Sequence, residues 1–284
     1  MTLIKKIIEN AQEGNYAFGM FNTSNLEVTQ AIARAAEEKN MPVLIGITES
    51  AVEYAGFLPI VNMVKAVIEE SSADLVMHLD HGKNSEFVKK CIDAGFESVM
   101  IDASRLDFEK NIEVTKDIVD YAHERGVVVQ AELGKIAKLD LSVESGVTLA
   151  KMEKTDPDEL EEFVNRTGAD TVAVIVGNIH GMYEAEGNPH LDLDLLQILR
   201  ERVSTPFILH GGSGTPSEDV IRGIKECGIV SVNIDTEVRI AFVTALNDFF
   251  VSGQMVIDPR KVLSIARDAV QKKVGDKISL FGSL

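Results

Sequence analysis

Eight short apolar segments recur along the chain, separated by amphipathic helical patterns. They are rich in β-branched residues and do not alternate apolar with polar positions, as is typical of strands buried in a parallel sheet. They span residues 17–22, 43–48, 75–80, 98–102, 127–133, 171–177, 206–211 and 230–235. Eight βα units within 284 residues predict an α/β fold of the closed (β/α)8 TIM-barrel type. The alternative, an open doubly wound sheet, usually has a Gly-rich turn after its first strand, whereas here MFNTSNLE follows.

Local signals agree with this alternation of strands and helices. Glycines at positions 95, 126 and 168 follow helical patterns as stop signals, and Asp156-Pro157 begins a new helix. No Pro/Gly/Ser-rich linker and no low-complexity segment interrupts the chain. We therefore predict a single barrel domain over residues 1–284, with an additional helix at its C-terminal end.

Composition argues against several classes of protein. The formal net charge is −17, which disfavours both a nucleic-acid-binding face and binding to anionic lipid. No uncharged apolar stretch of about 20 residues occurs, so we expect no membrane span. The N-terminus reads as an amphipathic helix rather than a signal peptide. Cys91 and Cys227 fall in separate helical patterns and form no disulfide framework, which makes a reducing cytoplasm the simplest setting.

Three of the six histidines are followed by glycine just beyond an apolar segment. These are His81 in HLDHG, His180 in GNIHG and His210 in LHGGSG. Because the carboxyl ends of all barrel strands meet at one mouth, the three imidazoles are expected to converge there. Three histidines with an open fourth position are the pattern of a catalytic zinc site.

A structural role is the alternative for any single histidine at a strand end. Three such histidines at one rim make that alternative the weaker one, in our judgement. The remaining histidines are predicted to be structural. His78 lies mid-strand, His123 at a helix C-terminus where a cation is favourable, and His190 in a loop.

Carboxylates follow the same strands. Asp80 adjoins a predicted ligand and is the best candidate for a general acid and base. Asp102 and Glu132 could orient ligands or hold a second metal, and Asp235 follows the eighth strand. Each of them could instead be a capping or salt-bridge group.

Two segments carry a phosphate-binding signal. The Gly-rich segment 211–216 follows the seventh strand, and segment 233–236 follows the eighth. Barrels frequently bind phosphate with these two loops. A Gly-rich turn alone is weak evidence, but its place beside a predicted metal ligand strengthens it.

Together these motifs resemble the class II, zinc-dependent ketose-bisphosphate aldolases, a family that includes fructose- and tagatose-bisphosphate aldolases. The resemblance covers nearly the whole chain, and as a set its motifs are highly specific. They are YAFGMFNTSNLE, HLDHG, SVMIDAS, AELG, TDPDELEEFVNRTGAD, GNIHGMY, LHGGSG, VNIDTE and DPRKVL.

The resemblance implies a role for each matching residue. His81, His180 and His210 would be the zinc ligands, and Asp80 would exchange a proton with the C4 hydroxyl. Glu144 of ESGV matches the loop glutamate that moves the C3 proton.

Other matches concern further ions and the phosphates. Asp102 and Glu132 match a second or alternative metal position, and the family often binds Na⁺ or K⁺ beside the phosphate. Arg260 matches an arginine that reaches the other phosphate from a neighbouring subunit, which implies a homodimer or homotetramer. The expected substrate and phosphate site comprises Asn22, Thr48, Gly181, Gly211, Gly212, Ser213, Asn233, Asp235, Thr236 and Arg260.

The chain departs from the family pattern at several positions. Ala137-Lys138 stands where the loop has two glycines, Ala103 replaces a glycine, and Thr48 replaces a serine. Glu184 stands where HGxYK has a lysine that pairs with phosphate. These changes leave the metal-binding pattern intact and alter the expected phosphate contacts.

We therefore expect metal-dependent, reversible aldol cleavage of a phosphorylated ketose, with fructose 1,6-bisphosphate as the first candidate. The expected products are dihydroxyacetone phosphate and an aldehyde such as glyceraldehyde 3-phosphate. Tagatose bisphosphate or another modified ketose phosphate is the alternative substrate. A zinc hydrolase and a non-catalytic metal-binding relative are the alternatives of another class.

Overall fold

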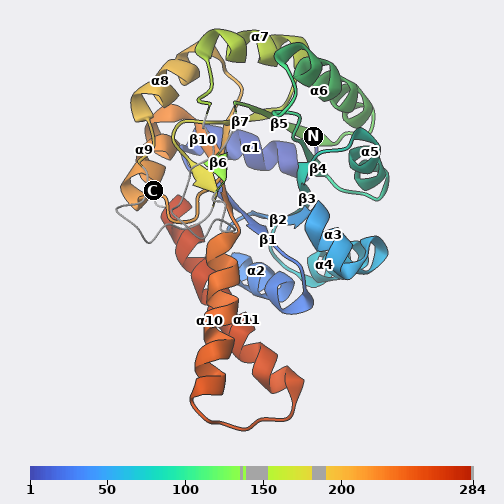
Figure 1. Ribbon diagram of the computed structural model, residues 1–284, viewed down its shortest axis with the longest axis vertical. Coiled ribbons are helices and arrows are strands. Elements are labelled where there is room, and N and C mark those ends of the chain that lie inside the picture. Colours follow the sequence, from blue (N-terminus) through green and yellow to red (C-terminus); the bar gives the residue numbers. More distant parts are fainter. Residues whose placement is uncertain (135–136, 139–152, 181–189, 283–284) are drawn as a thin grey trace, which may run out of the picture.

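Eight parallel strands close into a barrel in the computed structural model, which describes residues 1–134, 137–138, 153–180 and 190–282 (Figure 1). Around the barrel the order is β1, β10, β9, β7, β5, β4, β3 and β2, which closes on β1. The strands are β1 Phe18–Asn22, β2 Val43–Thr48, β3 Leu75–Gly82, β4 Ser98–Ile101, β5 Val128–Leu133, β7 Thr171–Val174, β9 Phe207–Leu209 and β10 Ile229–Ile234. All eight predicted strands and the barrel fold are confirmed.

Helices follow the strands and form the outer layer (Figure 1). The described helices are α1 Leu3–Gly14, α2 Leu26–Lys39, α3 Glu49–Ala55, α4 Phe57–Glu70, α5 Ser85–Asp93, α6 Phe108–His123, α7 Pro157–Thr167, α8 Leu193–Arg202, α9 Ser217–Cys227, α10 Thr236–Val251 and α11 Pro259–Phe281. Asp156 caps α7 by accepting from the amides of Asp158 and Glu159, as the Asp-Pro signal predicted. The additional C-terminal helix is α11.

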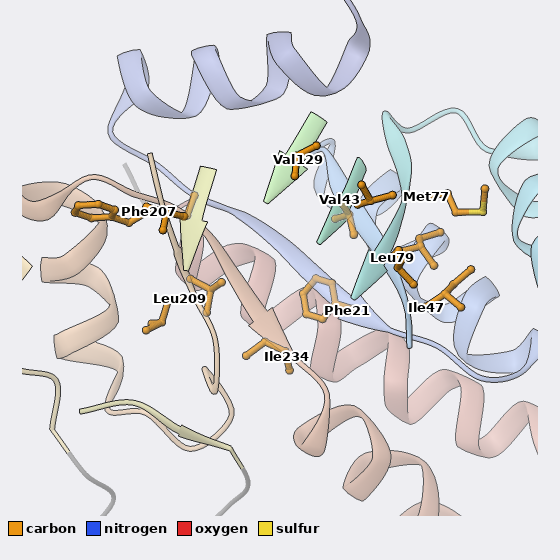
Figure 2. Close-up of a cluster of buried hydrophobic side chains, with 14 of the residues drawn as sticks. Phe21, Val43, Ile47, Met77, Leu79, Val129, Phe207, Leu209 and Ile234 are labelled. Atoms are coloured by element: carbon orange, nitrogen blue, oxygen red, sulfur yellow. The ribbon is translucent and has the colours of Figure 1, made fainter. Parts of the chain in front are cut away.

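The main hydrophobic core lies between the strands and this helical layer. Figure 2 shows strand side chains of this core, among them Phe21, Leu79 and Phe207. Apolar helix side chains belong to the same cluster. Each of the three named strand side chains is at least 98 % buried. Burial of this kind contributes about 25 cal/mol per Å² of apolar surface, so it drives closure of the barrel.

Helix α1 covers the amino-terminal end of the barrel. Its buried residues Ile4, Ile7 and Ile8 contact inward-facing strand residues such as Phe18 and Met20 in a second apolar cluster. Because this end of the barrel is filled by α1, the opposite, carboxyl-terminal end is left for polar side chains.

The last two helices depart from the compact ring. Helices α10 and α11 run side by side and project from the barrel as a helical arm, which we call the α10–α11 arm (Figure 1). Helix α11 also packs along α2. Phe250, Val251, Met255 and Ile257 in and beyond the end of α10 are 62–94 % exposed.

Two short strands lie outside the barrel. β6 (Ala137–Lys138) pairs in parallel with β8 (Ile179–His180). The sixth predicted strand was too long, because β7 ends at Val174 and the chain leaves the barrel there. Gly177 turns the chain with φ of +104°, and the Asn178 side chain accepts a hydrogen bond from the Val176 amide.

Among the described helices, no single one is long and apolar enough to cross a membrane. α3 and α4 meet that test only when joined, and they are bent by 103° at their junction.

Candidate active site

A cavity of about 400 Å³ opens at the carboxyl-terminal mouth of the barrel. Its walls come from the ends of β1, β2, β3, β9 and β10 and from the loops that follow them. Most of the predicted site residues meet here. The described lining residues are Asn22, Thr48, Glu49, Ser50, Asp80, His81, Lys83, His210, Gly211, Ser213, Asn233, Asp235 and Thr236.

A backbone irregularity lets Asp80 and His81 share this cavity. In a regular strand, neighbouring side chains point to opposite faces. Here the pairing of β3 with β4 shifts register between Leu79 and Gly82, and His81 has φ of +49°. That left-handed conformation costs a non-glycine residue about 1–2 kcal/mol. The bulge brings the acid and the imidazole to the same side, which explains why β3 ends on Asp-His-Gly.

His81 and His210 reach each other from opposite sides of the barrel. Nε2 of His81 and Nδ1 of His210 are 3.0 Å apart, and the rings meet edge to face. Two nitrogen ligands of one tetrahedral zinc lie about 3.3 Å apart, given metal–nitrogen bonds of about 2.0–2.1 Å. The observed separation therefore fits a pair of nitrogens that share one metal ion.

Asp80 lies beside this nitrogen pair. One of its carboxylate oxygens accepts a hydrogen bond, and the other accepts none from the described residues. Asn22 Nδ2 donates to Asp80 Oδ2 at 2.8 Å. Oδ1 is buried, has no hydrogen-bond partner among the described residues, and lies 3.9 Å from His81 Nε2. A buried carboxylate oxygen without a donor is costly, so it implies a ligand that supplies a proton or a positive charge.

Asp102 orients the imidazole of His81 from the side that faces away from the cavity. It accepts a hydrogen bond from His81 Nδ1 at 3.0 Å, so Nε2 faces the cavity, and Ser104 Oγ donates to its other oxygen at 2.7 Å. Burial would raise the pKa of Asp102, but the hydrogen bond and charge of His81 outweigh it and hold that pKa below its usual value. This carboxylate–histidine pair is the usual arrangement behind a metal-binding imidazole.

The local field favours a cation at this point. Burial would lower the pKa of His81, but the charge of Asp80 and the hydrogen bond to Asp102 raise it to about 9.

Glu132 is 99 % buried, and burial raises its pKa to about 7. Its Oε2 has no hydrogen-bond partner in the described part of the chain, and ligand atoms of His81, Asp102 and Glu132 lie within 4.8 Å of one another. These groups fit a second cation position.

His210 is held on its far side by two amides. Its Nε2 lies 2.5 Å from Gln130 Nε2 and 3.1 Å from Asn233 Nδ2. If Nδ1 binds a metal, Nε2 carries the proton and needs an acceptor. Turning either amide presents an oxygen to it, and Asn233 Oδ1 has no other partner among the described residues.

The backbone of His180 lies close to the strand end that carries His210. Asn178 Nδ2 donates to the carbonyl of His210 at 3.1 Å, which ties the segment before His180 to the strand end that carries His210. Gly211 has φ of +67°, and a Cβ there would collide with the carbonyl of Ile179. The backbone of His180 in β8 therefore lies beside the loop after β9, and its side chain is outside the described residues.

The loop after β9 is joined to the start of α10. The Gly212 amide donates to the carbonyl of Asn233 at 3.2 Å, and the Gly214 amide donates to Glu237 Oε1 at 3.0 Å. Asp235 precedes α10 without capping it and instead pairs with Arg239 at 2.7 Å. A helix N-terminus that faces a Gly-rich loop is a favourable environment for an anion.

A known protein family matches nearly the whole chain. The family model described as fructose-bisphosphate aldolase class-II matches residues 2–284. The chain belongs to this family. A fructose-bisphosphate aldolase of Geobacillus stearothermophilus is 43% identical over 284 residues, which are 99% of this chain and 96% of that protein.

Solved structures agree with this aldolase family. The YdjI aldolase of Escherichia coli K12 is 33% identical with a TM-score of 0.84, covering 99% of this chain and 96% of that chain. The fructose-bisphosphate aldolase of Campylobacter jejuni, at 21% identity and a TM-score of 0.82, covers 99% of this chain and 94% of that chain, and it shows the same fold.

Family membership decides between the classes of function. The protein is an aldolase, a carbon–carbon lyase of a metal-dependent family that acts on sugar phosphates. This family membership therefore argues against the two alternatives of another class, a zinc hydrolase and a non-catalytic metal-binding relative. Asp80, His81 and His210 form a described cluster that could hold a metal ion.

Some predicted site residues of this aldolase either lie away from the cavity or fall outside the described residues. Glu144, Gly181 and the departure at Glu184 lie outside the described residues. Arg260 begins α11 in the projecting arm, where its side chain is 89 % exposed and pairs with Asp258. Within one chain, therefore, Arg260 does not join the cavity. Thr48 does reach the cavity, although its hydroxyl also caps α3 by accepting from the Ala51 amide.

Several residues of this site were not predicted from the sequence. Glu49 and Ser50 at the start of α3, and Lys83 in the loop after β3, line the cavity at positions where no strand periodicity marks a side chain as inward. Gln130 could have been found, because it is a polar residue in an apolar strand, two positions before Glu132 and so on the same face.

Proposed function

We propose that this aldolase cleaves fructose 1,6-bisphosphate reversibly to dihydroxyacetone phosphate and glyceraldehyde 3-phosphate, with Zn²⁺ as its metal. One observation carries the proposal: the facing nitrogens of His81 and His210 lie next to a buried Asp80 oxygen that has no donor among the described residues. The relative from Geobacillus stearothermophilus, named for fructose bisphosphate, supports this choice of substrate.

The metal would be held by His81, His180 and His210, with Asp102 and Glu132 as a second divalent position. Bound there, Zn²⁺ supplies Lewis-acid polarisation of the ketose carbonyl. The three imidazoles are neutral ligands, so they leave the full charge of the ion in place. We also propose a Na⁺ or K⁺ ion beside the phosphate.

Asp80 is the proposed general base for the C4 hydroxyl. Asn22 holds Oδ2, so Oδ1 is the oxygen left to take the proton as the C3–C4 bond breaks. In the condensation direction the same group returns the proton. A fixed carboxylate with one free oxygen is suited to both directions.

The phosphate of the dihydroxyacetone half would bind between the loop after β9 and the start of α10. Backbone amides and small side chains there suit an anion without a fixed cation. The proposed contacts are Gly181, Gly211, Gly212, Ser213, Asn233, Asp235 and Thr236. Thr48 and Arg260 are the proposed contacts at the other phosphate.

Glu144 is the proposed residue that moves the C3 proton. Glu144→Gln is expected to slow solvent exchange of that hydrogen, measured on dihydroxyacetone phosphate in D₂O, by about 10²–10⁴-fold. Asp140→Asn, which neutralises another acid of the same segment, is the matched control and should exchange normally. Unchanged exchange in the Glu144 variant would assign the role to a different residue.

The α10–α11 arm supports a homodimer or homotetramer. The exposed apolar side chains Phe250, Val251, Met255 and Ile257 lie at its end, near Arg260. Soluble chains rarely leave such a group uncovered. Because Arg260 does not join the cavity of its own chain, a second copy of the chain is the proposed route by which it reaches a phosphate.

Arg260→Ala is expected to raise KM for fructose bisphosphate by about 10- to 100-fold, the effect of losing a hydrogen bond to a charged group. Turnover should change less. Arg222→Ala, at an exposed arginine of α9, is the control. Steady-state kinetics test this, and a KM equal to that of the control would refute the role of Arg260.

Tagatose bisphosphate or a modified ketose phosphate is the second candidate substrate. It differs at C4, the carbon whose hydroxyl Asp80 would contact, and Glu184 in place of the motif lysine favours a changed phosphate contact. The deciding experiment incubates the metal-loaded protein with fructose and tagatose bisphosphates and their monophosphates, and identifies products by mass. Absence of triose products from every ketose would refute the proposed function.

Residues 1–284 are proposed to act as one catalytic domain in the cytoplasm. The buried cysteines Cys91 and Cys227 are both free, which suits a reducing compartment. We propose no nucleic-acid or membrane partner, because the net charge of −17 would repel both.

A further inference from the structure

The cavity holds more negative than positive charge, although its proposed substrate is an anion with two phosphates. Its described lining includes the carboxylates of Glu49, Asp80 and Asp235. Lys83 is the one lysine or arginine among those lining residues. The loop after β9 offers backbone amides to one phosphate, so a cation side chain is needed chiefly at the other phosphate.

The ammonium group of Lys83 is available for a ligand. In the described part of the chain it makes no hydrogen bond and no ion pair, although acids outnumber bases by 45 to 28. Other lysines nearby are engaged: Lys89 pairs with Asp117 at 2.7 Å, and Lys90 lies 3.9 Å from the Phe57 ring centroid.

The backbone of Lys83 is nevertheless fixed. Its amide donates to Glu49 Oε1 at 2.8 Å, which ties the loop after β3 to the first turn of α3. Two residues earlier, His81 is anchored by Asp102. The base of the Lys83 side chain is thus held at the cavity rim, while its four-carbon stem leaves the charge free to meet a substrate.

Lys83 lies across the barrel mouth from the Gly-rich loop. In the closed ring of eight strands, β3 and β9 are four places apart and so lie on opposite sides. Asp80 and His81 stand at the end of β3, His210 follows β9, and all three line the same cavity as Lys83. A ketose whose C1 phosphate binds at residues 211–214 therefore extends its other end toward Lys83.

We propose that Lys83 binds the C6 phosphate of the ketose, and so makes the enzyme prefer a phosphorylated aldehyde product. This assignment rests on the proposed function. Lys83 is the contribution of this chain itself, in addition to the Arg260 that a second copy would bring. Without Lys83 the described lining has no lysine or arginine, and Glu49 beside it would repel the phosphate.

The test compares two ketoses that differ only in this phosphate. Lys83→Met removes the charge and keeps the stem, Lys83→Arg keeps the charge, and Lys6→Met is the control. Lys6 is exposed on α1, at the other end of the barrel, so this control makes the same change in net charge. Steady-state kinetics are measured with fructose 1,6-bisphosphate and with fructose 1-phosphate on the metal-loaded enzyme.

For Lys83→Met, kcat/KM for the bisphosphate is expected to fall about 10- to 100-fold, mostly through KM. For fructose 1-phosphate it should change less than about twofold, and Lys83→Arg should recover most of the loss. An equal fall for both ketoses, or no fall, would overturn the assignment. A wild-type protein that cleaves neither ketose would instead refute the proposed function, and this assignment with it.

Discussion

Replacing His210 with alanine is expected to lower turnover by about 10³-fold or more and to remove the bound metal. Lewis-acid stabilisation is worth several kcal/mol, and each 1.36 kcal/mol is a factor of ten in rate. His210 supplies one of the two facing nitrogens, so its replacement removes one of the proposed metal ligands. Turnover and metal content per chain, by elemental analysis, are the measurements.

The control for this variant is His123→Ala. His123 lies on α6 and contacts Asp170, away from the cavity, so its loss should leave both measurements unchanged. Because His210 is buried, a second arm uses the wild-type chain: a strong chelator should abolish activity and added Zn²⁺ should restore it. A variant that keeps a full equivalent of metal and near-normal turnover would refute the ligand assignment.

Asp80→Asn is expected to lower turnover by about 10²–10⁴-fold, the usual contribution of a general base. The amide has nearly the same shape and can still accept from Asn22 Nδ2, but its NH₂ group cannot take a proton from the C4 hydroxyl. Metal content should stay at the wild-type level, since three imidazoles are the proposed ligands. The combination of lost turnover and retained metal separates a base from a ligand.

Asp117→Asn serves as the matched control, because it neutralises an exposed aspartate that pairs with Lys89 on the outer surface. It should behave as wild type. If Asp80→Asn instead loses its metal, Asp80 belongs to the cation site that its position with His81 and His210 would also allow. Turnover close to that of the control would show that another group takes the proton.

Much of the fold followed from local patterns. Eight apolar segments and the helices between them were predicted from periodicity, because a strand buried on both faces must be apolar throughout. Segment boundaries were less exact where the backbone leaves its regular path, as at Gly177 and the register shift at Asp80-His81. Those departures depend on hydrogen bonds between segments, which a local pattern does not contain.

Part of the candidate site could be predicted from the sequence by the same local patterns. His81 and His210 were found because each follows an apolar segment, and barrel topology brings the ends of such segments to one mouth. Arg260 is a different case. The resemblance predicts that it reaches a phosphate from a neighbouring subunit, which stays a prediction, and the packing of α10 and α11 places it in the arm, away from the cavity of its own chain.

The sequence by itself determined which residues stand at strand ends, since strand periodicity and the polar residues that interrupt it are local properties. It thereby determined the barrel, the aldolase motifs and the main metal and acid–base candidates. Only the tertiary structure decided which side chains meet: the 3.0 Å approach of His81 and His210, the support of His210 by Gln130, and the place of Lys83 in the cavity. These depend on strand register and on loop paths across the barrel, where residues far apart in the chain come within hydrogen-bond distance.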